Sequence, residues 1–281
     1  MKKSVFANRT RKMTRRFFLS LAIIFMSLFS IFPFIWMVLV SLKDRVYTYD
    51  PSVWLFPPTL ENYIKVFSDR HLERYLINSA IIAIISTIIA ITIGSITAYG
   101  FARYKFKNRQ NFTFFLLSIR MLPAIGTVIP IFIIASYFKV IDTYFILIIT
   151  YLLFNVPFTV LMMQGFFEEI PYEVEEAAKV DGCSPFQALR RVILPLVMPG
   201  LIATSIFCII NAWNEFVYAL FLTTFNTSTT PTIVQIFLSV NGIIWGEMSA
   251  VGTIATLPVL IFAMIVQKNM IRGLSFGAVK G

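Results

Sequence analysis

The chain has few charged residues and few of the side chains that hold metals or carry catalysis. Only 14% of its 281 residues are Asp, Glu, Lys or Arg, whereas 58% are hydrophobic. One histidine and two cysteines, Cys183 and Cys208, offer too few ligands for a metal site. The sequence contains no GxxxxGK[ST] phosphate loop and no HExxH. The low charge and high hydrophobic content exclude a soluble globular domain. The missing metal ligands and motifs disfavour an enzyme or an ATPase.

Long apolar runs are what the chain has instead. A membrane-spanning helix needs about 20 predominantly apolar residues, and backbone groups in lipid must be satisfied within each segment. We therefore predict an all-α integral membrane protein with six transmembrane helices: Phe17–Leu42, Leu76–Tyr99, Phe112–Phe138, Tyr144–Phe167, Leu196–Thr223 and Met248–Gln267.

The net charge of +10 is unevenly distributed between the segments that join these spans. Basic residues crowd into 1–16, 103–109 and 268–281, whereas 43–75 is balanced and 224–247 has no Lys or Arg. This pattern predicts both termini in the cytoplasm, with 43–75 and 224–247 as external loops and 168–195 as a cytoplasmic loop within a core of 76–267. It does not favour nucleic acid as a partner.

A polar island at 173–195 stands between the fourth and fifth spans. Pro171 suits a first helical position, Gly182 a helix C-terminus, and Ser184-Pro185-Phe186-Gln187 a capping box that opens a second helix ending before Pro195. Such helices form a rigid exposed hairpin. Residues 168–181 carry six acids and a single Lys, which fits an interfacial lipid-lying helix poorly, so the hairpin is predicted to dock a soluble partner.

The island also resembles a known motif. Glu176-Ala177-Ala178, Gly182, and Val192-x-Leu194-Pro195 resemble the EAA loop of permeases of ABC importers, with Val192 where the family has Ile. SLKD at 41–44, FPPTLENY at 56–63, AWNEF at 212–216 and RGLSFGAVKG at 272–281 resemble the carbohydrate-uptake branch, specifically the smaller permease subunit of maltose-type systems. The resemblance implies a type I importer permease core.

The resemblance also implies partners: a second, larger permease, a homo- or heterodimeric ATPase that binds ATP and Mg, and an extracytoplasmic substrate-binding protein. The membrane would be the inner membrane of a bacterium or archaeon. The ATPase would contact an EAA loop comprising Glu175, Glu176, Ala177, Ala178, Asp181, Gly182, Ser184, Pro185, Leu194 and Pro195, and a tail that includes Gly273, Gly277 and Lys280. The loop at about 226–247 would probe the binding protein; from its residues it is either a short external helix or a re-entrant loop.

Polar residues inside the spans are the candidates for a translocation path. They are Arg120, Asn211, Trp213, Asn214 and Glu215. A buried ionisable group is functional by default, but Asn in a span also joins helices, and both interpretations stay open. Arg120 must pair with a carboxylate or line water, and Glu215 is one candidate partner.

The solute is predicted to be a sugar. A polyol or glycerol phosphate is also compatible with the branch and is the alternative solute. An ion-coupled secondary transporter that uses Glu215 is the alternative of another class, disfavoured because such folds show repeats and several buried carboxylates.

Overall fold

A computed structural model describes residues 2–104, 106–239 and 242–277, with side chains described between 16 and 267 except at 105 and 239–241. The chain forms two compact units. Unit 1 is Met1–Arg70 with Phe237–Ile254, and unit 2 is His71–Ile236 with Ala255–Gly281.

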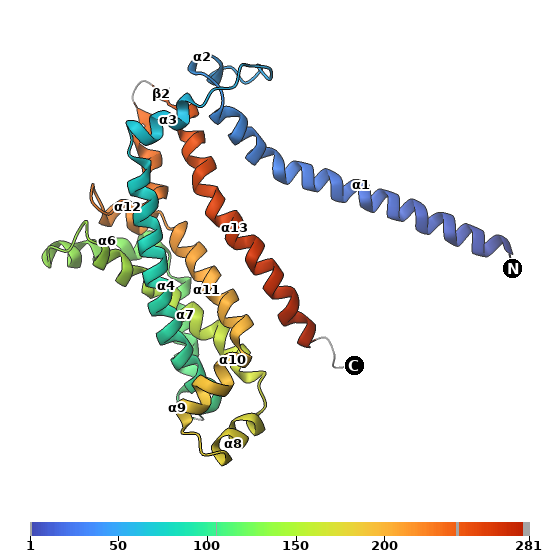
Figure 1. Cartoon of the computed structure of the whole chain (residues 1–281), viewed down its shortest axis with the longest axis vertical. Helices are drawn as coiled ribbons and strands as arrows, with labels where there is room; N and C mark the ends of the chain where they lie inside the picture. The colour runs from blue at the N-terminus through green and yellow to red at the C-terminus, as the bar shows by residue number, and fades with distance from the viewer. Residues whose placement is uncertain (1, 105, 240–241, 278–281) are drawn as a thin grey trace. The chain divides into compact units, whose positions relative to one another are not determined.

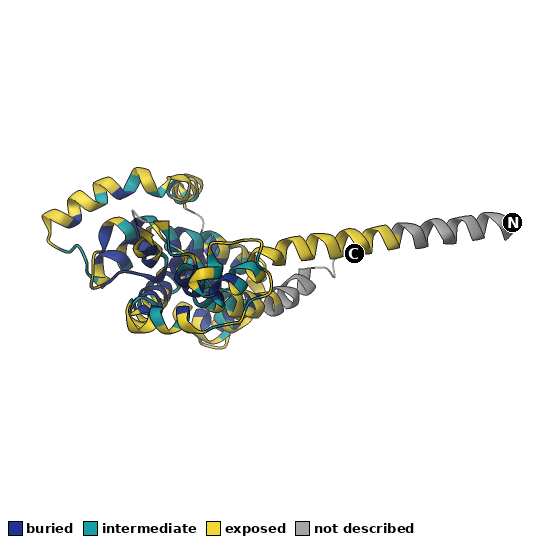
Figure 2. Ribbon diagram, turned by 90° about the horizontal axis from the view of Figure 1, so that it is seen from above, coloured by how far each residue is buried: buried dark blue, intermediate teal, exposed yellow. Residues whose placement is uncertain are grey.

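Unit 1 contains the first helix and the segments that follow it. Its elements are α1 (Lys2–Ser41), α2 (Arg45–Thr48), α3 (Glu61–Ser68), the antiparallel pair β1 (Leu238–Ser239) and β2 (Gly242–Ile243), and the start of α13 (Trp245–Gly277). Within α1, Arg16–Ser41 is long and apolar enough to span a membrane, and most of its large hydrophobic side chains are exposed (Figure 2). Exposed apolar side chains suit a lipid surface.

Two sequence motifs of unit 1 bind each other. The Asn62 side-chain amide donates hydrogen bonds to the carbonyls of Ser41 at 2.9 Å and Lys43 at 2.8 Å, and the hydroxyls of Ser41 and Tyr63 lie 2.7 Å apart. The backbone beyond α1 thus finds its partners in the first turn of α3. These contacts hold the segment after α1 against α3.

Unit 2 is built on long helices. Three of them, α4 (Leu72–Arg103), α7 (Tyr144–Glu168) and α11 (Met198–Trp213), lie beside one another in Figure 1. The later part of α13 also belongs to this unit. At the crossing of α4 and α7, a Cβ on Gly94 would lie 2.6 Å from the Thr159 side chain. Small residues let membrane helices approach closely, and Gly94 allows this contact.

The predicted third span is broken. Phe112–Phe138 is divided between α5 (Arg109–Met121) and α6 (Ala124–Tyr137), which meet at 91°. Pro123 is the N-cap of α6, and Leu122 before it is extended with φ −68° and ψ 125°. Proline lacks a backbone N–H and disfavours helical conformation in the residue before it, so the helix cannot run through this point.

The predicted fifth span is also shorter than expected. Leu196–Thr223 is divided between α11, which ends at Trp213, and α12 (Val217–Leu222). Before it, the second helix of the polar island continues past Pro195, through α9 (Pro185–Ala188), η1 (Leu189–Ile193) and α10 (Leu194–Leu196). The π-helical hydrogen bond from Leu194 N–H to the Leu189 carbonyl accommodates Pro195. The bend follows instead between Leu196 and Met198, at 80°.

The described residues therefore include four helices long and apolar enough to cross a membrane, or up to six if each bent pair counts as one span. The four are Arg16–Ser41, Leu72–Arg103, Tyr144–Glu168 and Trp245–Gln267. The all-helical prediction holds apart from the small β hairpin. Helix α13 continues through most of the predicted tail.

The loop between α12 and α13 is neither a regular α-helix nor a simple re-entrant turn. It contains the 3-10 helix η2 (Thr230–Phe237) followed by the β hairpin. Its polar beginning, residues 227–230, is buried. The Asn78 side chain donates to the carbonyls of Asn226 and Ser228, and the Asp142 carboxylate accepts backbone N–H groups of residues 224–227.

Candidate functional site

The polar island forms the expected helical hairpin. Helix α8 (Tyr172–Val180) is followed by Gly182, whose φ of +85° is the left-handed conformation that ends many helices. The Ser184 hydroxyl accepts from Gln187 N–H, and the Gln187 side chain accepts from Ser184 N–H, so the predicted capping box is present. Pro171 is one position earlier than predicted, at the N-cap. Figure 1 shows α8 and α9 together beside α10.

The hairpin presents one face and buries another. Most residues predicted to dock a partner are exposed: Glu176, Ala177, Asp181, Gly182, Ser184, Pro185 and Pro195. Val180 and Phe186 add exposed apolar surface, at 88% and 64%. Acidic, apolar and backbone-accessible groups thus lie together on a rigid element, which is suited to docking another protein.

Glu175 and Ala178 face the other way. The side chain of Ala178 is buried, and Leu194 packs partly buried against a cluster that includes Phe167 and Ile193. Glu175 is buried too, with its Oε2 3.0 Å from Arg103 Nε and its Oε1 2.9 Å from Lys179 Nζ. These three predicted docking residues therefore hold the hairpin to its own chain.

The electrostatics of Glu175 follow from those contacts. Burial by itself would raise the pKa of this carboxyl. The ammonium of Lys179, 2.9 Å away, together with the nearby Tyr99 hydroxyl and the charge of Arg103, outweighs burial and holds the pKa of Glu175 below its usual value. Glu175 is therefore a carboxylate at neutral pH.

A second candidate site is a cavity within unit 2. Its volume is about 460 Å³, and Arg120, Asn211 and Glu215 all line it. Its remaining walls are contributed by α5, α6, α7 and α12: Ile119, Leu122, Ala124, Thr127, Leu153, Phe154 and Tyr218. Two predicted path residues lie elsewhere, because Trp213 donates its Nε1–H to the Ala255 carbonyl at 3.1 Å, and Asn214 is exposed outside the cavity wall.

Glu215 has a structural task in this cavity. Its Oε1 accepts Tyr218 N–H at 3.0 Å and its Oε2 accepts Ala219 N–H at 3.2 Å, both in the first turn of α12. The Arg120 guanidinium lies over the Phe158 ring, 4.7 Å from its centroid. No ion pair joins Arg120 to Glu215 among the described residues. Of the two options that the sequence left for Arg120, the pairing with Glu215 is thus not formed, and Arg120 instead lines the cavity.

Among the cavity residues that the sequence-based prediction missed, Thr127, Phe154 and Tyr218 carry a hydroxyl or an aromatic ring. Tyr218 and Thr127 place their hydroxyls 2.6 Å apart, and the Phe154 and Tyr218 rings stack with centroids 6.4 Å apart. Hydroxyl pairs beside aromatic faces are chemically suited to a polyhydroxylated solute. The signal that could have found Tyr218 is its position three residues after Glu215.

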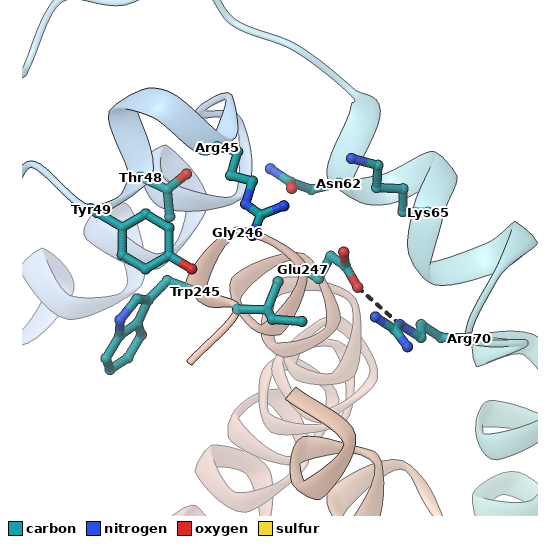
Figure 3. Close-up of a pocket in the computed structure, with 10 residues that line it drawn as sticks. Arg45, Thr48, Tyr49, Asn62, Lys65, Arg70, Trp245, Gly246 and Glu247 are labelled. Atoms are coloured by element: carbon teal, nitrogen blue, oxygen red, sulfur yellow. Dashed lines mark hydrogen bonds and ion pairs between the residues drawn. The ribbon is translucent and has the colours of Figure 1, made fainter. Parts of the chain in front are cut away.

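A polar pocket of about 180 Å³ lies within unit 1, and residues of α2, α3 and α13 line it. Figure 3 shows Arg70 and Glu247 side by side in its wall, with Arg70 Nε 3.0 Å from Glu247 Oε2. The Tyr49 hydroxyl donates to the Ile243 carbonyl at 3.0 Å. These contacts join the segments 45–49, 62–70 and 243–247.

Two further expectations bear on the site. No group of three or more His, Cys, Asp or Glu side chains is placed to hold a metal ion in the part of the chain that the structure describes. Gly273 and Gly277 belong to α13, but side chains there, and all of Lys280, lie outside the described residues.

Comparison with known proteins decides the family. The model of the binding-protein-dependent transport system inner membrane component matches residues 90–276, which include the hairpin and the cavity. The chain belongs to this family. A trehalose/maltose transport system permease of Thermococcus litoralis is 36% identical over 272 residues, covering 95% of this chain and 98% of that protein. A trehalose transport system permease of Mycobacterium tuberculosis is 35% identical over 256 residues, covering 90% and 93%.

The fold of this inner membrane component is found in a solved importer. A chain from a bacterial ABC transporter involved in the import of the acidic polysaccharide alginate superimposes with a TM-score of 0.73. The match covers 90% of this chain and 96% of that chain at 22% identity. The likeness shows the fold alone, a type I ABC importer permease fold.

Proposed function

We propose that this inner membrane component is the smaller permease subunit of an ATP-driven sugar importer. One observation carries the proposal: a capped hairpin with Glu176, Ala177, Gly182 and Pro185 exposed, held in place by contacts with the chain's own helices. Because the chain lacks a phosphate loop, the ATP that drives transport is hydrolysed by a partner, which binds the exposed side of the hairpin.

The partner at this face is an ATPase that binds ATP and Mg. Glu176 offers it a negative charge, while Ala177 and Gly182 let its surface approach the backbone of the hairpin. Closure of the ATPase dimer moves the hairpin, and the spans alternate between inward- and outward-open states. The chain itself catalyses no reaction.

The cavity lined by Arg120, Asn211 and Tyr218 forms one half of the solute path. A second, larger permease supplies the other half and completes the wall where the cavity is open. Polar donors beside aromatic rings suit a sugar. Relatives named for trehalose and maltose support a small oligosaccharide, and a polyol or glycerol phosphate is the alternative solute.

The opposite end of the spans receives a substrate-binding protein. Because 227–230 are buried against α4, the part of the loop in unit 2 that is free to meet it includes Val234 and Ile236, which are exposed. The charge pattern orients this loop outward, with both termini in the cytoplasm of a bacterium or archaeon.

Uptake by membrane vesicles tests the proposal. Radiolabelled trehalose, maltose, glycerol 3-phosphate and sorbitol are offered to vesicles with the intact complex, with a hydrolysis-deficient ATPase, or with an uncoupler. We expect uptake of a sugar that needs ATP and survives the uncoupler. Glu176→Lys should lower it at least tenfold, whereas Glu173→Lys on the same helix should change it less than twofold. Uptake that persists without ATP hydrolysis would refute the proposal.

A further inference from the structure

The last turn of α4 and the hairpin are joined by a buried ion pair. Arg103 ends α4, and Glu175 lies in the first turns of α8. Arg103 Nε and Glu175 Oε2 are 3.0 Å apart, and the two side chains are 3% and 5% exposed. A buried charge loses its hydration and depends on its partner, unlike the solvent-exposed charges elsewhere on the hairpin.

Neighbouring contacts fix the pair in one geometry. The Arg103 guanidinium also donates to the Ile170 carbonyl at 3.0 Å and lies over the Tyr172 ring at 4.7 Å. The Tyr172 hydroxyl donates back to the Ala102 carbonyl at 3.0 Å. Arginine's planar fork allows it to hold a carboxylate, a carbonyl and a ring face at once, which lysine cannot do.

The Arg103–Glu175 ion pair connects the hairpin to α4, the helix that packs against the other long helices of unit 2. Helix α4 packs along α7 and α11, and Tyr99, one turn before Arg103, stacks edge-on against Phe167 with centroids 5.7 Å apart. The hairpin therefore has a contact with α4 in addition to its chain connections through 169–171 and α10. It is fastened sideways to a spanning helix far from it in sequence.

We propose that Arg103 and Glu175 are positioning residues that make the hairpin and α4 a single lever, so that a push on the hairpin moves α4. The inference rests on the proposed function, because it requires an ATPase at the exposed face. Neither residue touches that partner: both are buried inside the chain. Weakening the Arg103–Glu175 ion pair is therefore expected to leave ATPase binding intact but to lower the number of solute molecules imported per ATP hydrolysed.

The test is the number of solute molecules imported per ATP hydrolysed by the purified complex in liposomes, using labelled trehalose or the panel sugar that the vesicles take up. Glu175→Gln removes the charge and keeps the shape, and Glu175→Asp keeps the charge but shortens the side chain. Glu173→Gln, exposed on the same helix, is the matched control. ATPase retention is measured by co-purification.

We expect the ratio to fall at least fivefold in Glu175→Gln and less in Glu175→Asp, with the ATPase retained and the control unchanged. If Glu175→Gln does not assemble, Glu175→Asp decides. A wild-type ratio in every variant that assembles would overturn the lever, as would a fall that merely follows loss of the ATPase. A wild-type complex without ATP-dependent uptake would instead refute the proposed function.

Discussion

The Glu215 carboxylate accepts the backbone N–H of Tyr218 at 3.0 Å, and so caps the first turn of α12. Its second oxygen accepts the N–H of Ala219. The first turn of any helix leaves backbone N–H groups without intrahelical partners. A carboxylate at this end accepts hydrogen bonds from them, and its negative charge is stabilised by the helix dipole. Capping of α12 therefore accounts for a carboxylate at this position without a role in binding a coupling ion.

The cap predicts how variants at Glu215 behave. Glu215→Gln keeps one acceptor oxygen, so uptake should stay ATP-dependent, insensitive to an uncoupler and within about threefold of wild type. Glu215→Ala removes both acceptors and should destabilise the chain by about 1–2 kcal/mol, the usual loss for a deleted cap. Thermal unfolding of the detergent-solubilised complex measures the second effect. Uptake by wild type that tracks the proton gradient and is abolished by Glu215→Gln would favour ion coupling instead.

Asp142 should make the loop at 224–227 sensitive to acid. Its carboxylate accepts the backbone N–H groups of Thr224, Phe225, Asn226 and Thr227, which hold its pKa well below the usual value despite the opposing effect of burial. A lowered folded-state pKa contributes stability that is complete above the unfolded pKa of about 3.9 and is lost as pH falls through the folded value.

Limited proteolysis of this loop checks the contribution of Asp142. Asp142→Ala should open the loop at neutral pH, at a cost of about 2 kcal/mol for lost charge-assisted hydrogen bonds. Asp142→Asn, which keeps one acceptor and tolerates the observed φ of 59°, should lie between the two. Equal cleavage rates in all three proteins would contradict this role for the carboxylate.

Asn62 and Gly246 should behave as a coupled pair. A Cβ on Gly246 would lie 2.6 Å from Asn62 Oδ1, and Asn62 is fixed by its bonds to the Ser41 and Lys43 carbonyls. Gly246→Ala and Asn62→Ala should each cost about 1–3 kcal/mol, by crowding and by leaving carbonyls unpaired. In the double variant the crowding is gone, so the two losses should not add. Strict additivity in thermal unfolding would show that the two residues do not interact.

Gly94 should be intolerant of a side chain in a way that Gly165 is not. Gly94→Val would drive atoms into Thr159, which lies 2.6 Å from an added Cβ, whereas an added Cβ on Gly165 meets nothing within 4 Å. Overpacking of this kind costs about 1–3 kcal/mol or prevents the helices from meeting. The yield of folded chain by size-exclusion chromatography should fall severalfold for Gly94→Val and little for Gly165→Val. Equal yields would place α4 and α7 farther apart.

Local rules predicted the hairpin correctly, whereas they gave neither the angles of the bends nor the burial of single side chains. The Ser184 capping box and the turn at Gly182 were predictable because each rests on contacts within four residues. Pro123 marked an interruption, but a proline pattern does not specify a bend of 91°. The inward face of Glu175 could not be read from α8 alone, because Arg103, some 70 residues earlier, supplies its partner. The same is true of Asn78, which draws residues 226–228 against α4.

The most direct test of the account is photo-crosslinking from two adjacent alanines of α8. In a Cys183→Ser, Cys208→Ala background, Ala177→Cys and Ala178→Cys are labelled with a photoactivatable maleimide in inside-out vesicles that contain the ATPase. Ala177 is exposed and Ala178 is buried. The account predicts labelling of Ala177→Cys from the cytoplasmic side and a covalent adduct with the ATPase, with far less at Ala178→Cys. Labelling of Ala177→Cys only from outside the cell, or no adduct with the ATPase, would contradict it.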